Sequence, residues 1–256
     1  MKKYEFIDKS LLKEASGRGQ QNFQFVDKAL WFPVEKVLVI ADLHIGYENS
    51  LNSSGVFLPR FQFEQIMSDL KKIFEKTGKV KEVVINGDLK HEFGKISEQE
   101  WTETLKVLNF LSENSEKIVL VRGNHDKSLE PIARRMKIGV VDFYVKGDTC
   151  FVHGDKLIPE CFDGKIERIV VGHRHPAVSI SDKYKKERYK CFLVGKYKKK
   201  EVIILPSFFP LIEGSDIVNS DSNLLFIPEE KLRNFEVYVV GDKLEVLHFG
   251  KLRDLE

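Results

Sequence analysis

Five short apolar runs, each ending in a polar turn that carries histidine, constrain the fold of this chain more than any other feature. The turns read ADLHIG, INGDLKHE, RGNHD, FVHGD and VGHRHP, in this order, between residues 41 and 176. A near-continuous β-branched and apolar run of strand length is typical of a strand buried on both faces. Because the ends of neighbouring parallel strands meet along one edge of a sheet, we expect these polar side chains to converge in space.

Strands and helices alternate in the first half of the chain. Strands are expected at residues 36–41, 82–86 and 117–121, and helices at 61–76, 97–114 and 129–136. The second of these helices opens with the capping-box pair Ser97 and Glu100. The second half predicts strands at 149–152, 167–171, 188–194, 201–205, 236–240 and 243–249, the last two around the turn Gly241–Asp242. This order of elements predicts an α/β fold.

The bulk composition is that of a globular chain. Its 256 residues are 42% hydrophobic and 31% charged, a length and balance that allow a full core without staples. We expect one domain over residues 1–256, with a metal-binding core at 36–176 and a strand-rich C-terminal part. The 41 basic and 39 acidic side chains leave a net charge of +2, which does not indicate any particular class of binding partner.

The cysteines and the apolar stretches predict a cytoplasmic protein. Cys150, Cys161 and Cys191 are odd in number and show no C-x-x-C spacing, so neither a disulfide framework nor a zinc knuckle is expected. The N-terminus is interrupted by charge every few residues, unlike a signal peptide. The longest apolar stretch, 202–212, contains Pro206 and Pro210 and is too short to span a bilayer, so no membrane segment is expected.

The polar turns offer a set of metal ligands. Asp42 with His44, and His173 with His175, are spaced by two residues, so each pair can aim two ligands the same way from an extended backbone. Imidazole nitrogens with carboxylate and amide oxygens suit divalent manganese, with nickel, iron or zinc as alternatives, and no turn carries a thiolate. Asp88 has two carboxylate oxygens and can bridge two ions about 3.5–4 Å apart around a shared hydroxide. A single-metal enzyme is an alternative.

The ordered motifs D-x-H, G-D-x-x-H, G-N-H-D, a lone H and G-H-x-H resemble those of the calcineurin-like metallophosphoesterases. The resemblance covers Asp42 to His175. It implies a four-layer α-β-β-α sandwich with two mixed sheets. It also implies that a metal-bridging hydroxide attacks phosphorus in line, while His125 gives a proton to the leaving-group oxygen. The ligand set that it implies places one ion at Asp42, His44 and His175 and the other at Asn124, His153 and His173, with Asp88 shared.

His91 departs from the pattern of the protein phosphatases in this superfamily, which carry an aspartate three residues after the shared one. A neutral imidazole can orient His125 but cannot raise its pKa as a carboxylate would, which favours a diester over a phosphoprotein. G-D-L-x-H instead resembles the SbcD-type repair nucleases and the bacterial and archaeal phosphoesterases related to them. We therefore expect a phosphodiesterase acting on nucleic acid or nucleotides. One alternative is a phosphomonoesterase or small-nucleotide hydrolase. The other is a non-catalytic scaffold, which the complete set of metal ligands disfavours.

Two weaker features each have two interpretations. Arg122 and Arg174 lie beside ligand positions and can clamp a substrate phosphate, or they can be arginines that support the ligand residues or lie at the surface. Residues 183–200 hold nine Lys or Arg against one Glu, with tyrosines interleaved, and predict an exposed β-hairpin. Such a hairpin can be a track for a phosphate backbone or a charged sheet edge that blocks aggregation.

Overall fold

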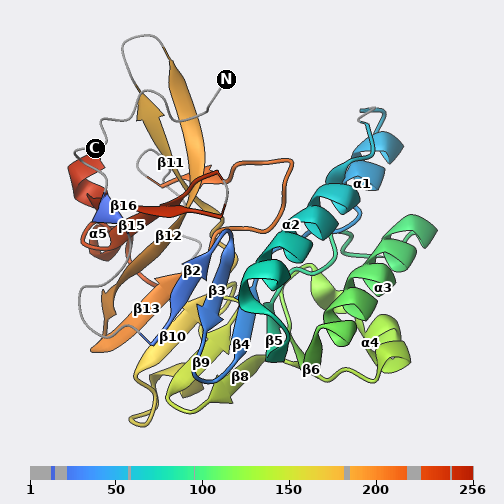
Figure 1. Cartoon of the computed structure of the whole chain (residues 1–256), viewed down its shortest axis with the longest axis horizontal. Coiled ribbons are helices and arrows are strands. Elements are labelled where there is room, and N and C mark those ends of the chain that lie inside the picture. The colour runs from blue at the N-terminus through green and yellow to red at the C-terminus, as the bar shows by residue number, and fades with distance from the viewer. Residues whose placement is uncertain are drawn as a thin grey trace.

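The chain folds around two β-sheets, shown in Figure 1 for a computed structural model. The structure describes residues 13–14, 22–56, 59–94, 96–181, 185–217, 226–242 and 244–255. Within this part of the chain, no helix is long and apolar enough to cross a membrane.

The first sheet has six strands in the order β2-β3-β4-β5-β6-β7. The strands β2, β3 and β4 pair antiparallel, and β4 to β7 pair parallel. The parallel strands therefore end along one edge of this sheet. The bounds are β2 (Gln24–Val26), β3 (Ala29–Phe32), β4 (Val37–Ile40), β5 (Val80–Asn86), β6 (Ser115–Val121) and β7 (Val140–Val141).

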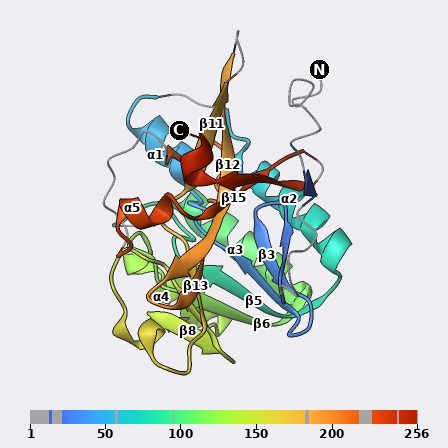
Figure 2. The same cartoon turned by 90° about the vertical axis from the view of Figure 1, so that its left-hand side faces the viewer.

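The second sheet has ten strands, with the path β1-β16-β15-β12-β13-β10-β9-β8; β11 also pairs with β12, and β14 pairs with β11. Its centre is parallel, because β10 pairs in parallel with both β9 and β13. The strand β11 forms an antiparallel hairpin with β12 that rises above the rest of the molecule in Figure 2. The bounds are β1 (Lys13–Glu14), β8 (Phe143–Lys146), β9 (Thr149–Val152), β10 (Arg168–Val171), β11 (Pro176–Ser181), β12 (Lys186–Tyr197), β13 (Lys200–Ile204), β14 (Ser215–Asp216), β15 (Glu236–Val240) and β16 (Val246–Lys251).

Alternation along the strands packs the two sheets face to face. In β4, Val37 and Val39 enter a core shared with the second sheet, while Leu38 and Ile40 face the other way. In β12, Phe192 and its neighbour two residues on enter the same shared core. Because successive strand residues point to opposite faces, each sheet buries one face against the other. The α/β fold class with two mixed sheets is confirmed.

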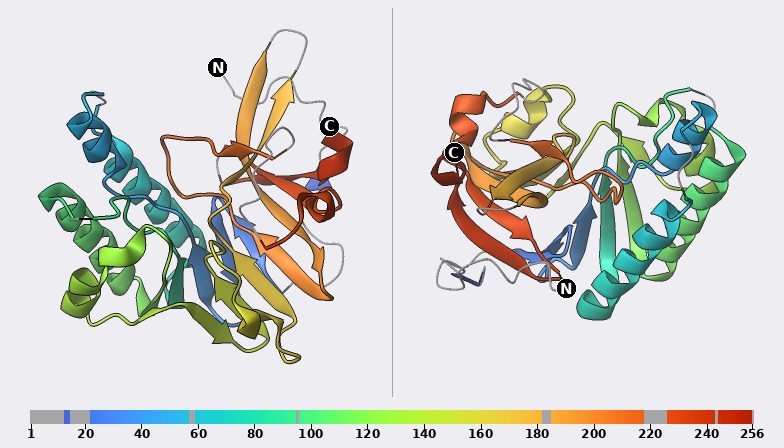
Figure 3. Two further views of the ribbon diagram at one scale, coloured as in Figure 1. Left: turned by 180° about the vertical axis from the view of Figure 1, so that it is seen from behind. Right: turned by 90° about the horizontal axis from the view of Figure 1, so that it is seen from above.

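The long helices cover the outer face of the first sheet, as Figure 3 shows from behind and from above. They are α2 (Gln62–Thr77), α3 (Glu98–Glu113) and the shorter α4 (Glu130–Met136), while α1 (Tyr47–Ser53) follows β4. The predicted cap of α3 is confirmed, because the Ser97 hydroxyl accepts a hydrogen bond from the Glu100 amide at 3.1 Å. The described residues on the outer face of the second sheet include only short helices: η3 (Pro159–Phe162), α5 (Glu229–Leu232) and η4 (Leu252–Leu255).

The predicted exposed hairpin at 183–200 is wrong for the residues that the structure describes; 183 and 184 lie outside them. Most of the segment is the single strand β12, which pairs with β11, β13 and β15. Tyr189, Cys191 and Leu193 on this strand are buried in the outer core of the second sheet. Because lysines lie at both ends of this strand, the sequence predicts exposure, although the middle of the strand is buried.

The expectation that the cysteines form no disulfide is also wrong. Cys150 of β9 and Cys161 of η3 form a disulfide with a Cα–Cα distance of 5.5 Å, and Cys191 is free and buried. The odd number of cysteines and their spacing say nothing about which of them the fold brings together. The pair lies in the outer core of the second sheet.

Candidate metal centre

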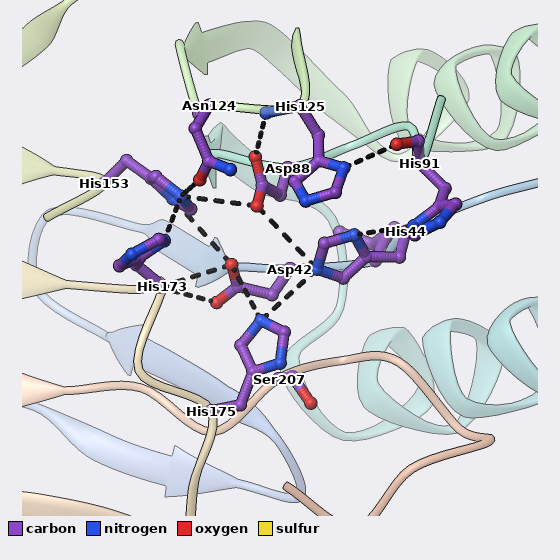
Figure 4. A network of polar contacts seen from close by, with 12 residues as sticks. Asp42, His44, Asp88, His91, Asn124, His125, His153, His173, His175 and Ser207 are labelled. Carbon is purple, nitrogen blue, oxygen red and sulfur yellow. Dashed lines mark hydrogen bonds and ion pairs between the residues drawn. The ribbon is translucent and has the colours of Figure 1, made fainter. Parts of the chain in front are cut away.

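The polar turns that follow β4, β5, β6, β9 and β10 meet at one place, shown in Figure 4. His153 comes directly after β9, while Asp42, Asp88 and His173 each follow the end of their strand by two residues. All seven predicted ligand residues and His125 lie in this group. The carboxyl ends of parallel strands in both sheets therefore build the centre, where ligands of α/β sheets commonly bind.

Five of the seven predicted ligands adopt left-handed backbone conformations. The φ angles are 56° for Asp42, 47° for His44, 51° for Asp88, 63° for His173 and 47° for His175. Residues with a Cβ atom seldom adopt such angles, at a cost of about 1–3 kcal/mol each, and they cluster at functional sites. Backbone bonds hold the turns together, because the Asp42 amide donates to Gly87 O and the His44 amide to Asp88 O, both at 3.0 Å.

One cluster of donor atoms consists of Asp42, His44 and His175. His175 Nε2 lies 3.3 Å from Asp42 Oδ1 and 3.3 Å from His44 Nε2. One ligand atom from each of the three residues lies within 4.8 Å of the other two. Two imidazole nitrogens and a carboxylate oxygen that converge in this way can hold one divalent cation.

A second cluster consists of Asp88, Asn124, His153 and His173. His153 Nε2 lies 3.1 Å from Asn124 Oδ1, 3.1 Å from His173 Nδ1 and 3.4 Å from Asp88 Oδ2. The same Asp88 oxygen lies 3.7 Å from His44 Nε2 of the first cluster. Asp88 thus lies between the two clusters, as a carboxylate shared by two cations must.

The protonation states of these groups fit a pair of divalent cations. Burial lowers the pKa of His44 to about 3 and also lowers that of His173, so both imidazoles are neutral at pH 7 and free to bind metal. Burial works against ionised Asp42 and Asp88, yet the adjacent imidazoles hold the pKa of both carboxyls below the usual value. His44 and His173 are therefore neutral nitrogen donors beside the ionised carboxylates of Asp42 and Asp88.

His153 shows how much negative charge the centre holds. Burial disfavours its charged form, but the hydrogen bond and charge of Asp88 and the charge of Asp42 raise the pKa of His153 to about 10. In the protein alone, this imidazole carries the proton that offsets the two carboxylates. A bound cation supplies the same compensation and releases the proton, which is the usual coupling between metal binding and ligand ionisation.

The carboxylate of Asp126 holds the turns of the centre together by accepting hydrogen bonds from their main-chain amides. Asp126 is fully buried, and its Oδ2 accepts hydrogen bonds from the amides of Asp88 at 2.8 Å and Gly123 at 2.9 Å. Its Oδ1 accepts one from Leu89 at 3.1 Å. Asp126 therefore holds the main chain of these turns, whereas Asp155, the aspartate of the FVHGD turn, is exposed.

His125 is held at the edge of the second cluster. Its amide donates to Asp88 Oδ1 at 2.9 Å, and its ring Nδ1 is hydrogen-bonded to the main-chain carbonyl of His91. Since a carbonyl only accepts, Nδ1 carries a proton and Nε2 is left to exchange one with a substrate. Lys90 donates to the carbonyl of His125 at 2.8 Å and to that of Glu92.

The side chain of His91 does not orient His125 by the hydrogen bond expected from the sequence. Its Nδ1 lies 3.5 Å from His44 Nδ1, and its ring stacks on that of His125 with centroids 5.1 Å apart. The carbonyl of His91 orients His125 instead. The sequence identified the right residue but could not reveal that its main chain makes the contact.

The expected phosphate clamp by Arg122 and Arg174 is not supported, because carboxylates elsewhere engage both guanidinium groups. Arg122 Nη1 lies 2.6 Å from Glu130 Oε1 in α4. Arg174 is buried, with Nη2 at 3.8 Å from Glu229 Oε1 in α5. Both are better described as paired arginines that join the centre's turns to neighbouring elements.

Sequence reasoning missed several residues that surround the centre. Lys90 and Glu100 are fully buried, and Glu100 Oε1 accepts the amides of His91 and Glu92, both at 2.9 Å. Gly123 leaves no room for a side chain, because an added Cβ would lie 2.1 Å from Asp88 Oδ1. The glycine in RGNHD was visible in the sequence as a turn residue, but the close approach of Asp88 was not.

Comparison with known proteins identifies a family and solved structures of similar fold. The family model described as calcineurin-like phosphoesterase matches residues 35–243. The nuclease MPE from Pseudomonas putida is 22% identical, covers 93% of this chain and 99% of its own, and superposes with a TM-score of 0.65. At that identity the likeness shows the fold alone.

Other solved structures are more distant. A protein of unknown function from Aquifex aeolicus is 17% identical, covers 54% of this chain and 78% of its own, and has a TM-score of 0.37. Vacuolar Protein Sorting 29 from Cryptosporidium parvum is 17% identical, covers 80% of this chain and 84% of its own, and has a TM-score of 0.34. Likenesses this weak carry no argument about function. No curated protein matches the chain.

Proposed function

The chain belongs to the calcineurin-like phosphoesterase family, and on that basis we propose that it is a two-metal phosphodiesterase that cleaves nucleic acid or nucleotide substrates. One observation carries the proposal: Asp88 Oδ2 lies 3.4 Å from His153 Nε2 in one cluster and 3.7 Å from His44 Nε2 in the other. A single carboxylate between two nitrogen-rich clusters is the arrangement that a two-metal hydrolase needs.

We propose that each of the two clusters holds one divalent cation. Manganese is the expected metal, with nickel, iron or zinc as alternatives, since the donors are nitrogen and oxygen without thiolate. When bound, the two cations would lower the pKa of water and neutralise charge on the phosphoryl group. Asp42, His44 and His175 would hold one cation and Asn124, His153 and His173 the other, with Asp88 shared.

His125 is proposed to donate a proton to the leaving-group oxygen. Its Nδ1 proton is held by the carbonyl of His91, so Nε2 is the nitrogen that can exchange a proton with substrate. A carbonyl orients the ring but brings no negative charge next to it, unlike a carboxylate. This partner supports a diester substrate rather than the phosphoproteins cleaved by relatives with an aspartate at the His91 position.

The likeness to the Pseudomonas putida nuclease makes nucleic acid the first natural substrate to test. The basic side chains of β12 favour a shorter substrate, because Lys186 and Arg188 lie at one end of the strand and Lys196 lies near the other. They form no continuous track for a long backbone within the described residues. A small-nucleotide hydrolase or phosphomonoesterase is therefore the second candidate.

The test compares hydrolysis of bis-p-nitrophenyl phosphate and p-nitrophenyl phosphate by metal-stripped protein with added manganese, nickel, magnesium or zinc. We expect manganese to restore activity, with the diester preferred. His125→Ala should lower turnover by about 10²–10⁴-fold while metal content stays unchanged. A preference for the monoester would select the second candidate, and inactivity with every metal would leave the non-catalytic scaffold.

A further inference from the structure

An exposed phenylalanine lies directly against the proposed proton donor. The ring centroid of Phe93 is 3.8 Å from that of His125, and the two rings are inclined by 32°. Phe93 is nevertheless 51% exposed. One side of its ring therefore covers the imidazole, while a large part of the side chain remains open to solvent at the centre.

Phe93 is the outermost member of a row of rings along one side of the centre. His91 stacks on His125 at 5.1 Å, and Tyr47 meets the edge of His91 at 4.7 Å. Tyr47 also contacts Phe209, whose ring lies 5.6 Å from that of His44. The row thus runs from the first metal cluster past His125 to an aromatic face in solvent.

Buried charges fix the backbone that presents Phe93. The carbonyl of Glu92 accepts a hydrogen bond from Lys90, and the Glu92 amide donates to Glu100 Oε1 at 2.9 Å. Lys90 and Glu100 are both fully buried. Both polar main-chain groups of the residue before Phe93 are therefore hydrogen-bonded. Because this backbone is already fixed, binding a ligand to the ring costs little conformational entropy.

We propose that Phe93 is a stacking platform for the base of a nucleoside leaving group, and so a specificity-determining residue of this phosphoesterase. The inference rests on the proposed function: His125 protonates the leaving oxygen, so the group attached to that oxygen lies beside the ring that covers His125. A planar base can lie flat on the open part of Phe93, while a methyl or ribose-only leaving group cannot. Stacking on an aromatic ring tolerates any base and needs no charge.

The first experiment measures discrimination by the leaving side. Thymidylyl-thymidine is compared with the same diester whose leaving nucleoside lacks its base, with hydrolysis followed by chromatography in the metal that restores activity. Wild-type protein should favour the complete dinucleotide in kcat/KM by on the order of 10-fold. Phe93→Ala and Phe93→Leu should reduce the ratio to about one, and Phe93→Trp should keep it, since only a ring provides the platform.

A matched control uses another exposed phenylalanine. Phe61 is 44% exposed and has no ring contact with a histidine of the centre among the described residues. Phe61→Ala should keep the wild-type ratio. A ratio near one in the wild-type protein, or a ratio unchanged by Phe93→Ala, overturns the inference even if the enzyme is an active phosphodiesterase.

A binding readout separates this inference from the proposed function. A non-hydrolysable phosphorothioate dinucleotide with 2-aminopurine on the leaving side loses fluorescence when the base stacks. We expect quenching with wild-type protein and Phe93→Trp, and its loss with Phe93→Ala. Quenching that survives Phe93→Ala excludes the platform, whereas inactivity with every metal, in the presence of Phe93-dependent quenching, contradicts only the catalytic proposal.

Discussion

The strand β5 carries a buried carboxylate near each end, and the two meet opposite surroundings. Near its start, Glu82 lies 2.9 Å from Lys117 Nζ and also pairs with Lys146. Just beyond its end, Asp88 faces imidazoles: His153 Nε2 at 3.4 Å and His44 Nε2 at 3.7 Å. Both carboxyl groups keep a pKa below the usual value against burial, but only Glu82 does so with lysines that bring permanent charge.

This contrast separates a structural carboxylate from a functional one. Lys117 and Lys146 already balance the negative charge of Glu82, so this carboxylate needs no bound cation. Asp88 is surrounded by groups that are neutral or protonated according to what is bound, since the pKa of His44 is lowered to about 3 while that of His153 is raised to about 10. A buried carboxylate surrounded by imidazoles, which can exchange a proton for a metal ion, is the feature that indicates metal binding.

Replacing the shared carboxylate should have the largest effect. Asp88→Asn keeps the shape of the side chain but removes the charge between the clusters, so we expect kcat/KM on bis-p-nitrophenyl phosphate to fall by about 10³-fold or more. Bound metal, measured by atomic emission on dialysed protein, should fall below that of the wild type. Full metal content together with full activity would show that Asp88 is not the shared ligand.

Adding one methyl group behind Asp88 should have the next largest effect. In Gly123→Ala the new Cβ would lie 2.1 Å from Asp88 Oδ1 and 2.4 Å from the Asp88 amide nitrogen, so the carboxylate must move. We expect a fall of about 10²-fold in kcat/KM, because displacements of about 1 Å in a catalytic constellation cost that much.

The matched control for this glycine lies next to β7, the edge strand that pairs with β6 in the first sheet. An added Cβ at Gly139, directly before β7, meets no heavy atom within 4 Å. Gly139→Ala should therefore leave activity within about twofold of wild type. Equal losses in both variants would argue against a specific contact between Gly123 and Asp88.

Removing the charge at the other end of β5 should change stability but not catalysis. Glu82→Gln leaves Lys117 and Lys146 beside a neutral amide, and both lysines are partly exposed to solvent. We expect the free energy of unfolding in urea to fall by about 1–2 kcal/mol with kcat/KM unchanged. A large loss of activity with normal stability would show that Glu82, like Asp88, acts in catalysis.

Lys190 provides the converse case, a buried lysine whose amino group donates to a hydroxyl and to main-chain carbonyls. Its Nζ donates to Ser207 Oγ at 2.7 Å and to the Ser207 carbonyl at 3.0 Å, and burial lowers its pKa to about 7. Between pH 7 and about 10 the unfolded chain binds a proton that the folded protein does not. The free energy of unfolding should therefore rise with pH in this window, by at most about 1.4 kcal/mol per unit.

Lys190→Met should remove that pH slope, measured by urea unfolding at pH 7, 8 and 9. Lys186, an exposed lysine of the same strand, gives the control variant Lys186→Met, which should keep the wild-type slope. A slope that persists in Lys190→Met would mean that another group titrates on unfolding in this range.

Much of the fold could be predicted because its signals are local. The runs that became β9 and β15 were predicted with their observed bounds, and the Ser97 cap of α3 was visible as a four-residue pattern. The extent of β12 could not be predicted in the same way. Its lysine-rich ends suggest solvent, whereas its middle is buried by pairing with β15, more than forty residues further along the chain.

The sequence by itself determined the chemistry that the strand ends carry. The ordered turns specify which residues offer nitrogen or oxygen donors, and their spacing places each of them within a few residues of a strand end. Such information survives in the sequence because a buried strand and the turn that follows it are set by neighbouring residues.

Only the tertiary structure decided which partner each side chain meets. Arg174 pairs with Glu229, Cys150 bonds Cys161, and His125 Nδ1 donates its hydrogen bond to the main-chain carbonyl of His91. The physical reason is that packing pairs most buried polar groups with whatever partner the fold brings near, often from distant parts of the chain. A residue's chemistry is local, but its surroundings, and therefore its role, belong to the whole molecule.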